Sequence, residues 1–498
     1  MPILLDLLPD DPHRPTLLGA DGTPFAPTGL RSTVEHLAAR LAMLGVAAGE
    51  RVAIVLPGGP TLALCFLAAA TVATAAPLNP RYREEEFAFY YADTNATTLL
   101  IGPDTPPAAL AAASLAMRVI TVQPDAHGQL ELEIVRGVRT PQTLMLPTAD
   151  AVALVLHTSG TTSRPKRVPL RHRNLVASAQ HIVQTLAITP DDTTLCVMPL
   201  FHIHGLVASL LAPLAAGGTV VATPGFDALR FWSLVRDAAP TWYSAVPTMH
   251  QMLLARAERN PEVLRGHRLR FVRSSSASLP PAVMEQLETV IGAPVIESYG
   301  MTEASHQMTS NLLPPGERLA GSVGFGVGVQ VAIMAEDGSL LPAGVRGEVA
   351  VRGPNVMDGY ENNPQADALA FVDGWFRTGD QGIRDAAGRL TLTGRLKELI
   401  NRGGEKIGPI EIDDVLLRHP AVAEALAFAA PHPTLGEEVH AAVVLRPGAV
   451  ADVRALRDHC ATLLADFKVP RTIYLLESLP RGATGKLQRI GMHERLTG

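Results

Sequence analysis

A short hydroxyl-rich stretch at residues 156–170, LHTSGTTSRPKRVPL, contains the residue types in this chain that are best suited to chemistry. It follows the apolar run 151–156 and combines threonines and serines with one glycine and Lys166. Backbone amides in a glycine-containing turn before a helix, together with hydroxyl donors and one lysine, form a cradle for phosphate oxygens. The spacing differs from the Walker pattern, because no GK[ST] sequence occurs here. The stretch by itself leaves two interpretations open, a nucleotide-phosphate site and a solvated turn.

Strand and helix patterns alternate around this stretch. The β-branched runs 51–57 and 151–157 are each followed by an apolar or amphipathic segment, which predicts parallel strands joined by crossover helices. After the second run, apolar residues from Leu175 to Leu186 recur at helical spacing, and Asn174 is placed to cap the first turn. We therefore expect the hydroxyl-rich stretch to be a strand-to-helix loop.

The texture of the sequence changes twice in its second part. From about residue 318, short β-branched segments separated by turn residues predict an antiparallel, barrel-like subdomain. After Arg395, a unit of about 100 residues follows in the order helix, strand, strand, helix, strand. This unit is expected to be a small α+β domain.

The composition is that of a folded globular chain with a small-molecule partner. A length of 498 residues suits about three domains, and 47% hydrophobic with 18% charged residues lies in the globular range. A net charge of −6 argues against a nucleic-acid partner, because nucleic-acid binding favours a basic face.

Three features predict a cytoplasmic location away from membranes. The three cysteines, at positions 65, 196 and 460, are widely separated and odd in number, so no disulfide framework is indicated. The N-terminus lacks the basic start and long apolar centre of a signal peptide. The longest apolar run, 62–76, is too short to span a bilayer and is predicted to be a buried helix.

Four distant motifs follow the hydroxyl-rich stretch in a fixed order. They are SYGMTE (298–303), WFRTGD (375–380), GRLKELINRGGEKIGPIEI (394–412) and RGATGK (481–486). With these motifs the chain resembles, over nearly its full length, the adenylate-forming superfamily of acyl-CoA synthetases, luciferases and peptide-synthetase adenylation domains. The resemblance implies an α/β fold, with a large N-terminal domain (1–396) of two sheet-and-helix subdomains plus a β-barrel, and a small mobile α+β C-terminal domain (397–498).

The resemblance also implies an ATP site. Lys486 would be the catalytic lysine that bridges the attacking carboxylate and the phosphate, Thr302 would contact the α-phosphate, and Glu303 would bind Mg²⁺. Taken alone, Lys486 would be read as a solvated lysine. The other implied contacts are Thr158, Ser159, Gly160, Thr161, Thr162 and Lys166 for the β- and γ-phosphates, Tyr299 for adenine, Asp380 and Arg395 for the ribose, and Ser276, Ala277, Ser278, Glu297, Ser298 and Gly300 around the nucleotide.

A second half-reaction needs a thiol to approach the acyl-adenylate. In the family the small domain rotates for this step about a pivot two residues after the ribose-binding arginine, which is Lys397 here. Gly403 and Gly404 would then enter the site, because glycines permit close backbone approach, although an ordinary turn is the alternative. The chain stops twelve residues after Lys486, which leaves no room for a carrier domain and favours coenzyme A as acceptor.

The acid substrate is indicated by the segments that line the acyl pocket in the family: PLFHIHG (199–205), RSSSASL (273–279) and ASHQMTS (304–310). Their hydroxyls and imidazoles suit a fatty chain poorly, because each buried CH₂ contributes about 0.8 kcal/mol only in apolar surroundings. The segments resemble the oxalate–CoA ligase branch. Ser276, His306 and His204 would hold the second carboxylate, and His202 would lie near the reacting one. In the alternative, Ser276 merely replaces a family glycine beside adenine and His306 turns into the core.

One residue departs from the family pattern. Arg167 follows the loop lysine where the family normally has glycine, and Arg171, His172 and Arg173 extend the basic cluster. The cluster either steers polyanions toward the site or is a solvated basic face. Two other functions remain open, an adenylation enzyme that loads a separate carrier protein and a noncatalytic nucleotide-binding regulator.

Overall fold

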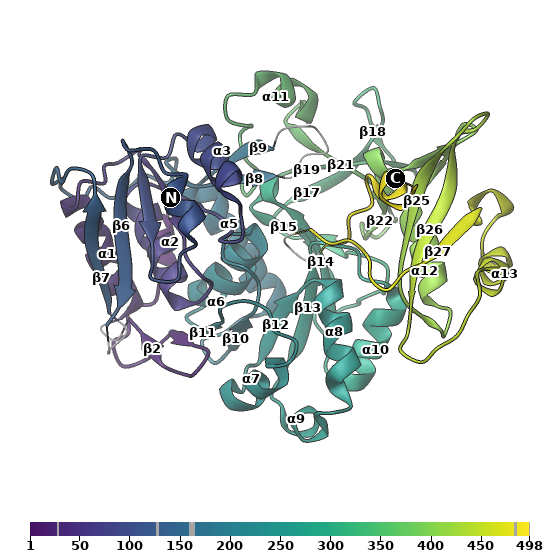
Figure 1. The fold of residues 1–498 in the computed structure, drawn as a ribbon, viewed down its shortest axis with the longest axis horizontal. Coiled ribbons are helices and arrows are strands. Elements are labelled where there is room, and N and C mark those ends of the chain that lie inside the picture. The colour runs from purple at the N-terminus through teal and green to yellow at the C-terminus, as the bar shows by residue number, and fades with distance from the viewer. Residues whose placement is uncertain (27–28, 126–128, 159–164, 483–485, 498) are drawn as a thin grey trace.

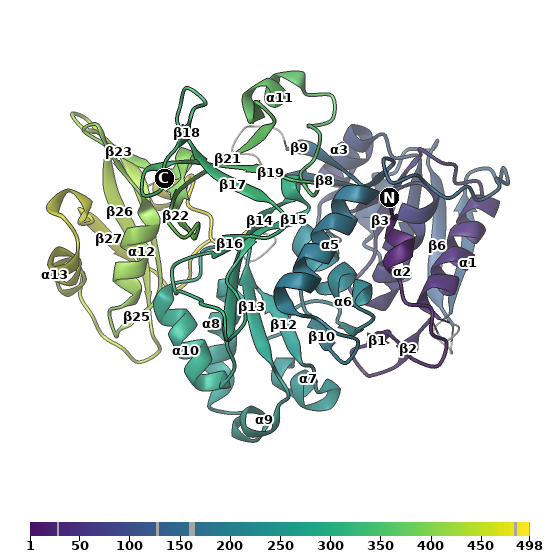
Figure 2. The same ribbon diagram turned by 180° about the vertical axis from the view of Figure 1, so that it is seen from behind.

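The computed structural model describes residues 1–26, 29–125, 129–158, 165–482 and 486–497. The strands in these ranges form four sheets, and Figure 1 shows two helix-covered sheets beside an antiparallel sheet and a separate C-terminal unit. Figure 2 shows from behind that the C-terminal unit lies at the end of the molecule opposite α1 (Leu30–Met43). The expected α/β class is confirmed. No helix in the described ranges is both long and apolar enough to cross a membrane.

The first sheet has seven strands in the order β7-β6-β5-β3-β4-β8-β9. β3 (Arg51–Val55) pairs in parallel with β4 (Thr74–Pro77) and β5 (Thr98–Ile101), as the alternating pattern predicted. The prediction of one helix over 62–76 is wrong, because α2 (Pro60–Val72) ends before β4 begins. A strand buried on both faces is as continuously apolar as a buried helix, so the pattern could not separate them. The other elements of this unit are α1, α3 (Glu84–Thr94), α4 (Pro107–Ala111), β6 (Arg118–Pro124) and β7 (Leu130–Arg136).

The hydroxyl-rich stretch spans the two strands of a β-hairpin, and the prediction of a strand-to-helix loop is wrong. β8 (Val152–Thr158) pairs antiparallel with β9 (Lys166–Arg171), and only then does α5 (His172–Leu186) begin. Val168 and Leu170 are buried while the residues between them and beside them are less so, which is the two-residue period of a strand. This period covers too few residues to stand out in the sequence.

Asn174 also differs from its prediction, because it is not the residue that caps α5. The capping position is Arg171, and Asn174 is the third helical residue, where its Oδ1 accepts a hydrogen bond from the Arg171 amide at 3.0 Å. Its Nδ2 donates to the carbonyls of Pro354 and Val356, at 2.8 and 3.0 Å. Asn174 therefore satisfies a backbone amide at the start of the helix. It also connects α5 to the segment that contains Pro354 and Val356.

The second sheet has nine strands in the order β16-β15-β14-β13-β12-β10-β11-β1-β2. Its central strands β10 (Thr193–Cys196), β12 (Trp242–Ala245), β13 (Phe271–Ser275) and β14 (Val295–Met301) are parallel neighbours. β15 (His306–Ser310) runs antiparallel to β14. The other elements are η1 (Leu4–Leu7), β1 (Leu17–Gly19), β2 (Pro24–Phe25), α6 (Ala212–Ala215), β11 (Thr219–Ala222), α7 (Phe231–Ala238), α8 (Pro247–Ala257), α9 (Pro261–Gly266), α10 (Pro281–Ile291), η3 (Thr302–Ala304) and β16 (Phe325–Gly326).

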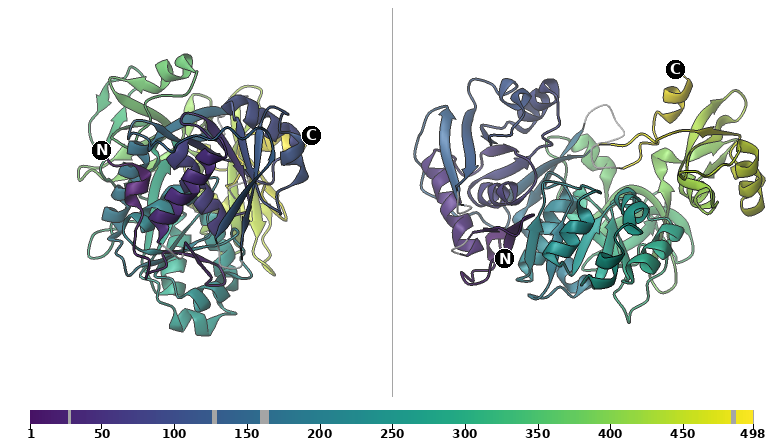
Figure 3. Two further views of the ribbon diagram at one scale, coloured as in Figure 1. Left: turned by 90° about the vertical axis from the view of Figure 1, so that its left-hand side faces the viewer. Right: turned by 60° about the horizontal axis from the view of Figure 1, so that its bottom comes forward.

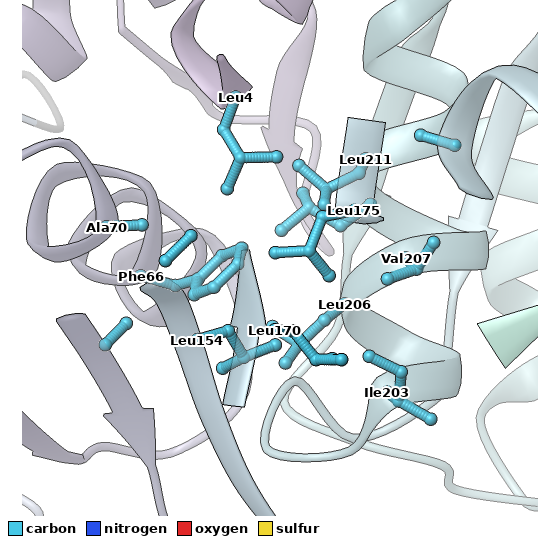
Figure 4. Packing of buried hydrophobic residues seen from close by; sticks show 14 of the residues in the cluster. Leu4, Phe66, Ala70, Leu154, Leu170, Leu175, Ile203, Leu206, Val207 and Leu211 are labelled. Carbon is cyan, nitrogen blue, oxygen red and sulfur yellow. The ribbon is translucent and has the colours of Figure 1, made fainter. Parts of the chain in front are cut away.

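A π-helix, η2 (His204–Leu211), follows β10. Such helices are rare and frequently lie at functional sites. Figure 4 shows Leu206 and Leu211 of η2 facing Phe66 of α2 and Leu170 of β9 across one apolar core. These side chains are almost fully buried. The packing holds η2 in place, and His204 is its first residue.

The subdomain expected to be barrel-like is a six-stranded antiparallel sheet, in which β21 (Trp375–Arg384) pairs with β19 (Arg346–Arg352) and β22 (Leu390–Arg395). The C-terminal unit has its own apolar core and a five-stranded sheet. Its elements from α12 to the last strand, β27, follow the predicted order of α-helices and strands, whereas two strands before α12 and one helix after β27 were not predicted. The right-hand view of Figure 3 shows this unit set apart from the other sheets. The remaining elements are β17 (Gln330–Met334), β18 (Leu340–Leu341), α11 (Pro364–Ala370), β20 (Phe371–Val372), η4 (Leu396–Glu398), β23 (Ile400–Arg402), β24 (Glu405–Ile407), α12 (Pro409–Leu417), β25 (Val422–His432), β26 (Gly436–Leu445), α13 (Val453–Leu463), η5 (Asp466–Lys468), β27 (Thr472–Leu475) and α14 (Met492–Thr497).

Candidate active site

Several predicted site residues lie at the ends of neighbouring parallel strands. β13 ends just before Ser276, and β14 is followed directly by Thr302 and Glu303. The carboxyl ends of parallel strands meet at one edge of a sheet, where open α/β sheets bind their ligands. In Figure 1 the yellow segment that precedes α14 reaches from the C-terminal unit toward β14 and β15. The ends of β13 and β14 and the segment before α14 therefore meet at this edge of the second sheet.

Lys166 and Glu303, predicted to hold the ATP phosphates and Mg²⁺, are linked through one tyrosine. Lys166 begins β9 opposite Thr158, the last residue of β8. Its Nζ lies 4.4 Å from the centre of the Tyr360 ring, and the Tyr360 hydroxyl donates to Glu303 Oε1 at 3.1 Å. The structure thus brings the two predicted residues to one place. Ser159, Gly160, Thr161 and Thr162 lie outside the described residues.

The Glu303 carboxylate suits one hard cation. It is 6% exposed, and burial raises its pKa. In the part of the chain that the structure describes, no cluster of three or more His, Cys, Asp or Glu side chains could hold a metal ion. One carboxylate is enough for Mg²⁺ when substrate phosphates supply further oxygens, which is how this ion is usually held. The donor set therefore fits Mg²⁺ bound together with ATP.

Asp380 and Arg395, predicted to bind the ribose, are partners across two strands. They lie opposite each other on β21 and β22, and Arg395 Nε donates to Asp380 Oδ1 at 2.8 Å. Tyr299, predicted to face adenine, donates its hydroxyl to Asp380 Oδ2 at 2.6 Å. Burial, together with the charge of Asp380, holds the pKa of Tyr299 well above its usual range, so the phenol remains a donor. The three residues form one hydrogen-bonded group.

The other predicted nucleotide contacts divide into exposed and buried side chains. Ala277 and Ser278 are exposed after β13. Ser298 is buried, and its hydroxyl lies 2.9 Å from Ser310 Oγ. Glu297 is also buried, where Oε1 accepts a backbone amide at 2.8 Å and burial raises its pKa to about 8. The side chain of Ser298 is therefore already occupied within the protein.

Gly300 has a packing reason to be glycine. A Cβ at this position would lie 1.6 Å from the carbonyl oxygen of His306, far inside any contact distance. β14 and β15 approach this closely only because position 300 has no side chain. Gly300 therefore holds the backbone of His306 against β14.

Lys486 lies beside the nucleotide-site residues although it belongs to the C-terminal unit. Burial, with Arg395, lowers its pKa to about 8, whereas the carboxylates of Asp380 and Glu303 raise it. Arg395, Asp380 and Glu303 are therefore charged groups that surround the ammonium. The structure therefore brings the predicted catalytic lysine into the site.

His204, His306 and Ser276, predicted to hold the acid, form one cluster, in which both histidines are buried and Ser276 is partly exposed. The two imidazole rings stack with their centroids 4.7 Å apart, and His204 Nδ1 lies 3.0 Å from Ser276 Oγ. Burial holds the pKa of both histidines well below its usual range, so both are neutral at pH 7. His202, predicted near the reacting carboxylate, lines a neighbouring pocket with Thr302, and burial lowers its pKa to about 3.

The backbone is strained at this cluster. Ser276, Ser305 and His306 have φ angles of +73°, +49° and +95°, which residues other than glycine rarely adopt. Left-handed backbone costs such a residue roughly 1–2 kcal/mol. Residues in these conformations concentrate at functional sites, where the surrounding structure holds them. The strain marks Ser276 and His306 as candidate site residues independently of the motifs.

Lys397 and the pair Gly403–Gly404, predicted to act in the second half-reaction, are not joined to the nucleotide residues by any described contact. Lys397 is exposed in η4, between β22 and β23. Gly403 and Gly404 form the turn between β23 and β24, with φ angles of +60° and +96°. Two positive φ angles are those of a type I′ hairpin turn, which explains both glycines structurally.

Arg167, which departs from the family pattern, is bound to acids of the protein itself. Its side chain is 10% exposed, with Nε 3.4 Å from Asp93 Oδ2 and Nη1 3.8 Å from Glu361 Oε2. Arg173 pairs with Asp358 at 2.6 Å. The described part of the basic cluster therefore joins β9 and α5 to neighbouring segments and does not form a free basic surface.

Sequence reasoning assigned no role to three residues of this region, although Arg273 begins one of the segments expected to line the acyl pocket. Tyr360 links Lys166 to Glu303, and Ser244 and Arg273 lie behind His204, with Ser244 Oγ 2.6 Å from His204 Nε2. Arg273 could have been found from the sequence, because it is a charged residue within a buried strand, β13. Charged residues are almost never fully buried without a partner. A single tyrosine or serine carries no comparable signal.

Comparisons with known proteins agree with this arrangement. Residues 22–361 match the family described as AMP-binding enzyme, and residues 411–486 match the AMP-binding enzyme C-terminal domain. The oxalate–CoA ligase of Arabidopsis thaliana is 45% identical over 469 residues, which cover 92% of this chain and 91% of that protein. The sulfoacetate–CoA ligase of Cupriavidus necator is 38% identical over 485 residues, with 96% and 94% covered. The ATP-bound structure of MatB from Rhodopseudomonas palustris superposes with a TM-score of 0.88 at 30% identity, covering 99% of this chain and 98% of that one.

Proposed function

The chain belongs to the family of AMP-binding enzymes, and on this premise we propose that it is an oxalate–CoA ligase. It is an acid–CoA ligase that uses ATP and coenzyme A. The proposed reaction adenylates one carboxylate of oxalate and then transfers the oxalyl group to coenzyme A, giving oxalyl-CoA, AMP and pyrophosphate. Other short acids, including the sulfoacetate named for one relative, and a carrier protein as acceptor are the alternatives.

The observation that supports oxalate is the largely buried polar cluster of His204, Ser276 and His306. An apolar acyl tail gains nothing from such surroundings, because its burial is favourable only against apolar groups. The second carboxylate of oxalate remains charged after the first is adenylated. Hydrogen bonds to charged groups contribute about 1.5–3 kcal/mol each, so imidazole N–H and hydroxyl donors can hold it.

In the proposed first half-reaction, a carboxylate oxygen attacks the α-phosphate of ATP in line with the leaving pyrophosphate. Lys166 would hold the β- and γ-phosphates, and Thr302 and Lys486 would meet the charge that develops on the α-phosphate oxygens. Mg²⁺ held by Glu303 would neutralise phosphate charge when bound. Asp380 and Arg395 would fix the ribose, so that the α-phosphate lies within reach of Lys486.

In the proposed second half-reaction, the thiol of coenzyme A attacks the acyl carbon and AMP leaves. Lys486 would cover the carboxylate end of the bound acyl-adenylate, so the C-terminal domain would have to move before the thiol can approach. We place the boundary between the domains at 396/397 and the pivot at Lys397, in the one-turn helix η4. The turn at Gly403–Gly404 would then enter the site, and His202 would lie near the reacting carbon.

A test of the substrate compares acids on the parent and on His306→Ala. The parent should have its highest kcat/KM with oxalate among oxalate, malonate, sulfoacetate, acetate and hexanoate. His306→Ala should lower kcat/KM for oxalate by at least about tenfold, which corresponds to about 1.4 kcal/mol of transition-state binding. Acetate should lose much less, because it has no second charge to bind. Pyrophosphate release measures the kcat/KM of the parent and of the variant with each acid.

The matched control for this test is His172→Ala. His172 is also a buried histidine, but it begins α5, where its Nδ1 accepts a hydrogen bond from the Leu4 amide at 3.2 Å. Its loss should reduce stability and leave the ratio of oxalate to acetate activity unchanged. A parent that prefers hexanoate, or a His306→Ala variant that loses all acids equally, contradicts the diacid pocket.

A second prediction uses the backbone strain at Ser276. Ser276→Ala and Ser276→Gly both remove the hydroxyl, so each should lower kcat/KM for oxalate by roughly tenfold. The glycine variant should be more stable than the alanine variant by about 1 kcal/mol, because only glycine relieves the left-handed φ of +73°. Equal unfolding free energies in denaturant titrations would show that the backbone is not strained there.

A further inference from the structure

A fully buried arginine lies directly behind the acid-binding cluster. Arg273, on β13, is 0% exposed, and no carboxylate in the described ranges forms an ion pair with it. Its Nη1 lies 3.1 Å from His306 Nε2 and 3.2 Å from Ser244 Oγ, and its Nη2 lies 3.1 Å from Gln307 Oε1. Its Nε is buried without a partner. Burial lowers the pKa of Arg273 to about 9, so the guanidinium is still cationic at pH 7.

This contact determines where His306 carries its proton. A guanidinium has five N–H donors and no acceptor, so the Nε2 atom of His306 must accept from Arg273. A neutral imidazole that accepts at Nε2 carries its proton on Nδ1. The Nδ1 atom of His306 makes no hydrogen bond to any described residue. His306 therefore has one free N–H donor, on the side away from Arg273.

The same reasoning extends through Ser244 to His204. The donor Nη1 of Arg273 lies 3.5 Å from His204 Nε2 and 3.2 Å from Ser244 Oγ, so a proton on Nε2 would face another donor. His204 Nε2 therefore accepts, and Ser244 Oγ donates to it at 2.6 Å. His204 then carries its proton on Nδ1 and donates it to Ser276 Oγ at 3.0 Å. The Ser276 hydroxyl accepts this bond, so its proton is free for another acceptor. A second donor results, at the strained residue where β13 ends.

We propose that Arg273 is a positioning residue for acid specificity, which orients His306 and, through Ser244 and His204, the Ser276 hydroxyl as donors toward the second carboxylate of the substrate. The inference rests on the proposed function, because it names the residue that makes the acid-binding cluster selective for a second anion. Without the guanidinium, either imidazole can carry its proton on the other nitrogen. A lone pair would then face the carboxylate and repel it.

The charge of Arg273 adds to this orientation. Burial is the main cause of the lowered pKa of His306. Arg273, His202 and Lys486 are the charged and titratable groups that face the two histidines, and each lowers this pKa further. The histidines are therefore neutral donors, and Arg273 supplies the positive charge behind them. A monoacid has no second anion for these groups to bind, so it should depend on Arg273 far less.

The test measures kcat/KM for oxalate and acetate on Arg273→Met, Arg273→Lys and the parent. Methionine fills the buried space without charge or donors, and should lower kcat/KM for oxalate by about thirtyfold and that for acetate by less than threefold. The KM for ATP should change less than twofold. Lysine keeps the charge and one donor position, so it should recover a part of the oxalate activity. Arg270→Met is the control, because that arginine pairs with Asp192 at 2.8 Å and precedes the same strand.

Two results separate this inference from the proposed function. A parent that does not prefer an acid with a second anionic group overturns both. A parent that prefers oxalate, with an Arg273→Met variant that loses oxalate and acetate activity equally, overturns the role of Arg273 and leaves the proposed function standing.

A measurement on the parent alone covers the case in which the variants fail to fold. The ratio of kcat/KM for oxalate to that for acetate should stay within twofold between pH 6 and 8, because neutral donors do not titrate there and the ratio cancels any shared effect of Lys486. If the histidines bound oxalate as imidazolium ions, the ratio would fall as the pH rises above about 6.5. Such a fall would overturn the inference.

Discussion

Replacing Lys486 with alanine should lower the rate of adenylate formation by about a thousandfold, the loss expected when one preorganised electrostatic group is removed from a developing charge. The lysine lies close to Asp380, Glu303 and Arg395, beside the proposed α-phosphate position. Thioester formation from supplied acyl-adenylate and coenzyme A should stay within about threefold of the parent, because that step does not use the ammonium. Separate measurements of pyrophosphate release and of thioester formation check the two half-reactions.

The control for this variant is Lys468→Ala, which removes another lysine of the C-terminal unit that pairs with Glu411 at 2.7 Å. Adenylation should be unchanged in it. The parent gives an independent check, because the pKa of Lys486 is lowered to about 8. The kcat/KM for adenylation should therefore fall as the pH rises above about 8, where the lysine loses its proton. Equal loss of both half-reactions in a folded Lys486→Ala variant would count against the assignment.

Replacing Lys397 with proline should slow thioester formation by about a hundredfold and adenylation by less than threefold. Lys397 lies in the one-turn 3₁₀ helix η4, and the φ of about −50 to −70° that is typical of such helices includes the value that proline imposes. The present arrangement, with Lys486 in the site, should therefore form as before. Rotation of the C-terminal domain about this residue requires a torsion change that the ring opposes, so only the second half-reaction is affected.

Lys397→Ala is the matched control, because it removes the same exposed side chain and leaves the torsions free. Both half-reactions should continue at the parent rate in it. Single-turnover measurements of adenylate and thioester separate the steps. A normal thioester rate in Lys397→Pro would remove this residue from the pivot role, and a loss in both variants would assign the effect to the lysine side chain.

Local patterns predicted the elements wherever consecutive residues repeat one period over a sufficient length. The amphipathic repeat from Leu175 to Leu186 is confirmed as α5, and the predicted order of helices and strands is confirmed from α12 to β27, although β23, β24 and α14 were not predicted. Predictions failed where the period was short or degenerate. The run 62–76 conceals the change from α2 to β4, and β9 has only two buried residues with which to show its alternation.

The motifs predicted some, but not all, of the contacts between residues of the candidate site. Asp380 and Arg395 were paired from two separate motifs, and the structure joins them at 2.8 Å. Lys486 was assigned from a motif near the C-terminus, and the structure brings it to these residues. The route between Lys166 and Glu303 through Tyr360 was not foreseen, because nothing local distinguishes this tyrosine from others.

By itself, the sequence determined the residue types available for the chemistry and the order of most of the elements that carry them, because motifs and secondary-structure patterns both depend on residues that are neighbours in the chain. It left open whether the histidines and serines of the acyl segments meet a substrate or fill a core. Only the tertiary structure decided that Arg273 lies under His204 and His306, which are 69 and 33 residues away along the chain. That meeting depends on the pairing of β12, β13 and β14, on the close approach of β15 at Gly300 and on the π-helix that begins at His204. Packing between distant segments sets these contacts, and the charge of one buried guanidinium then determines which atoms of the two imidazoles can donate.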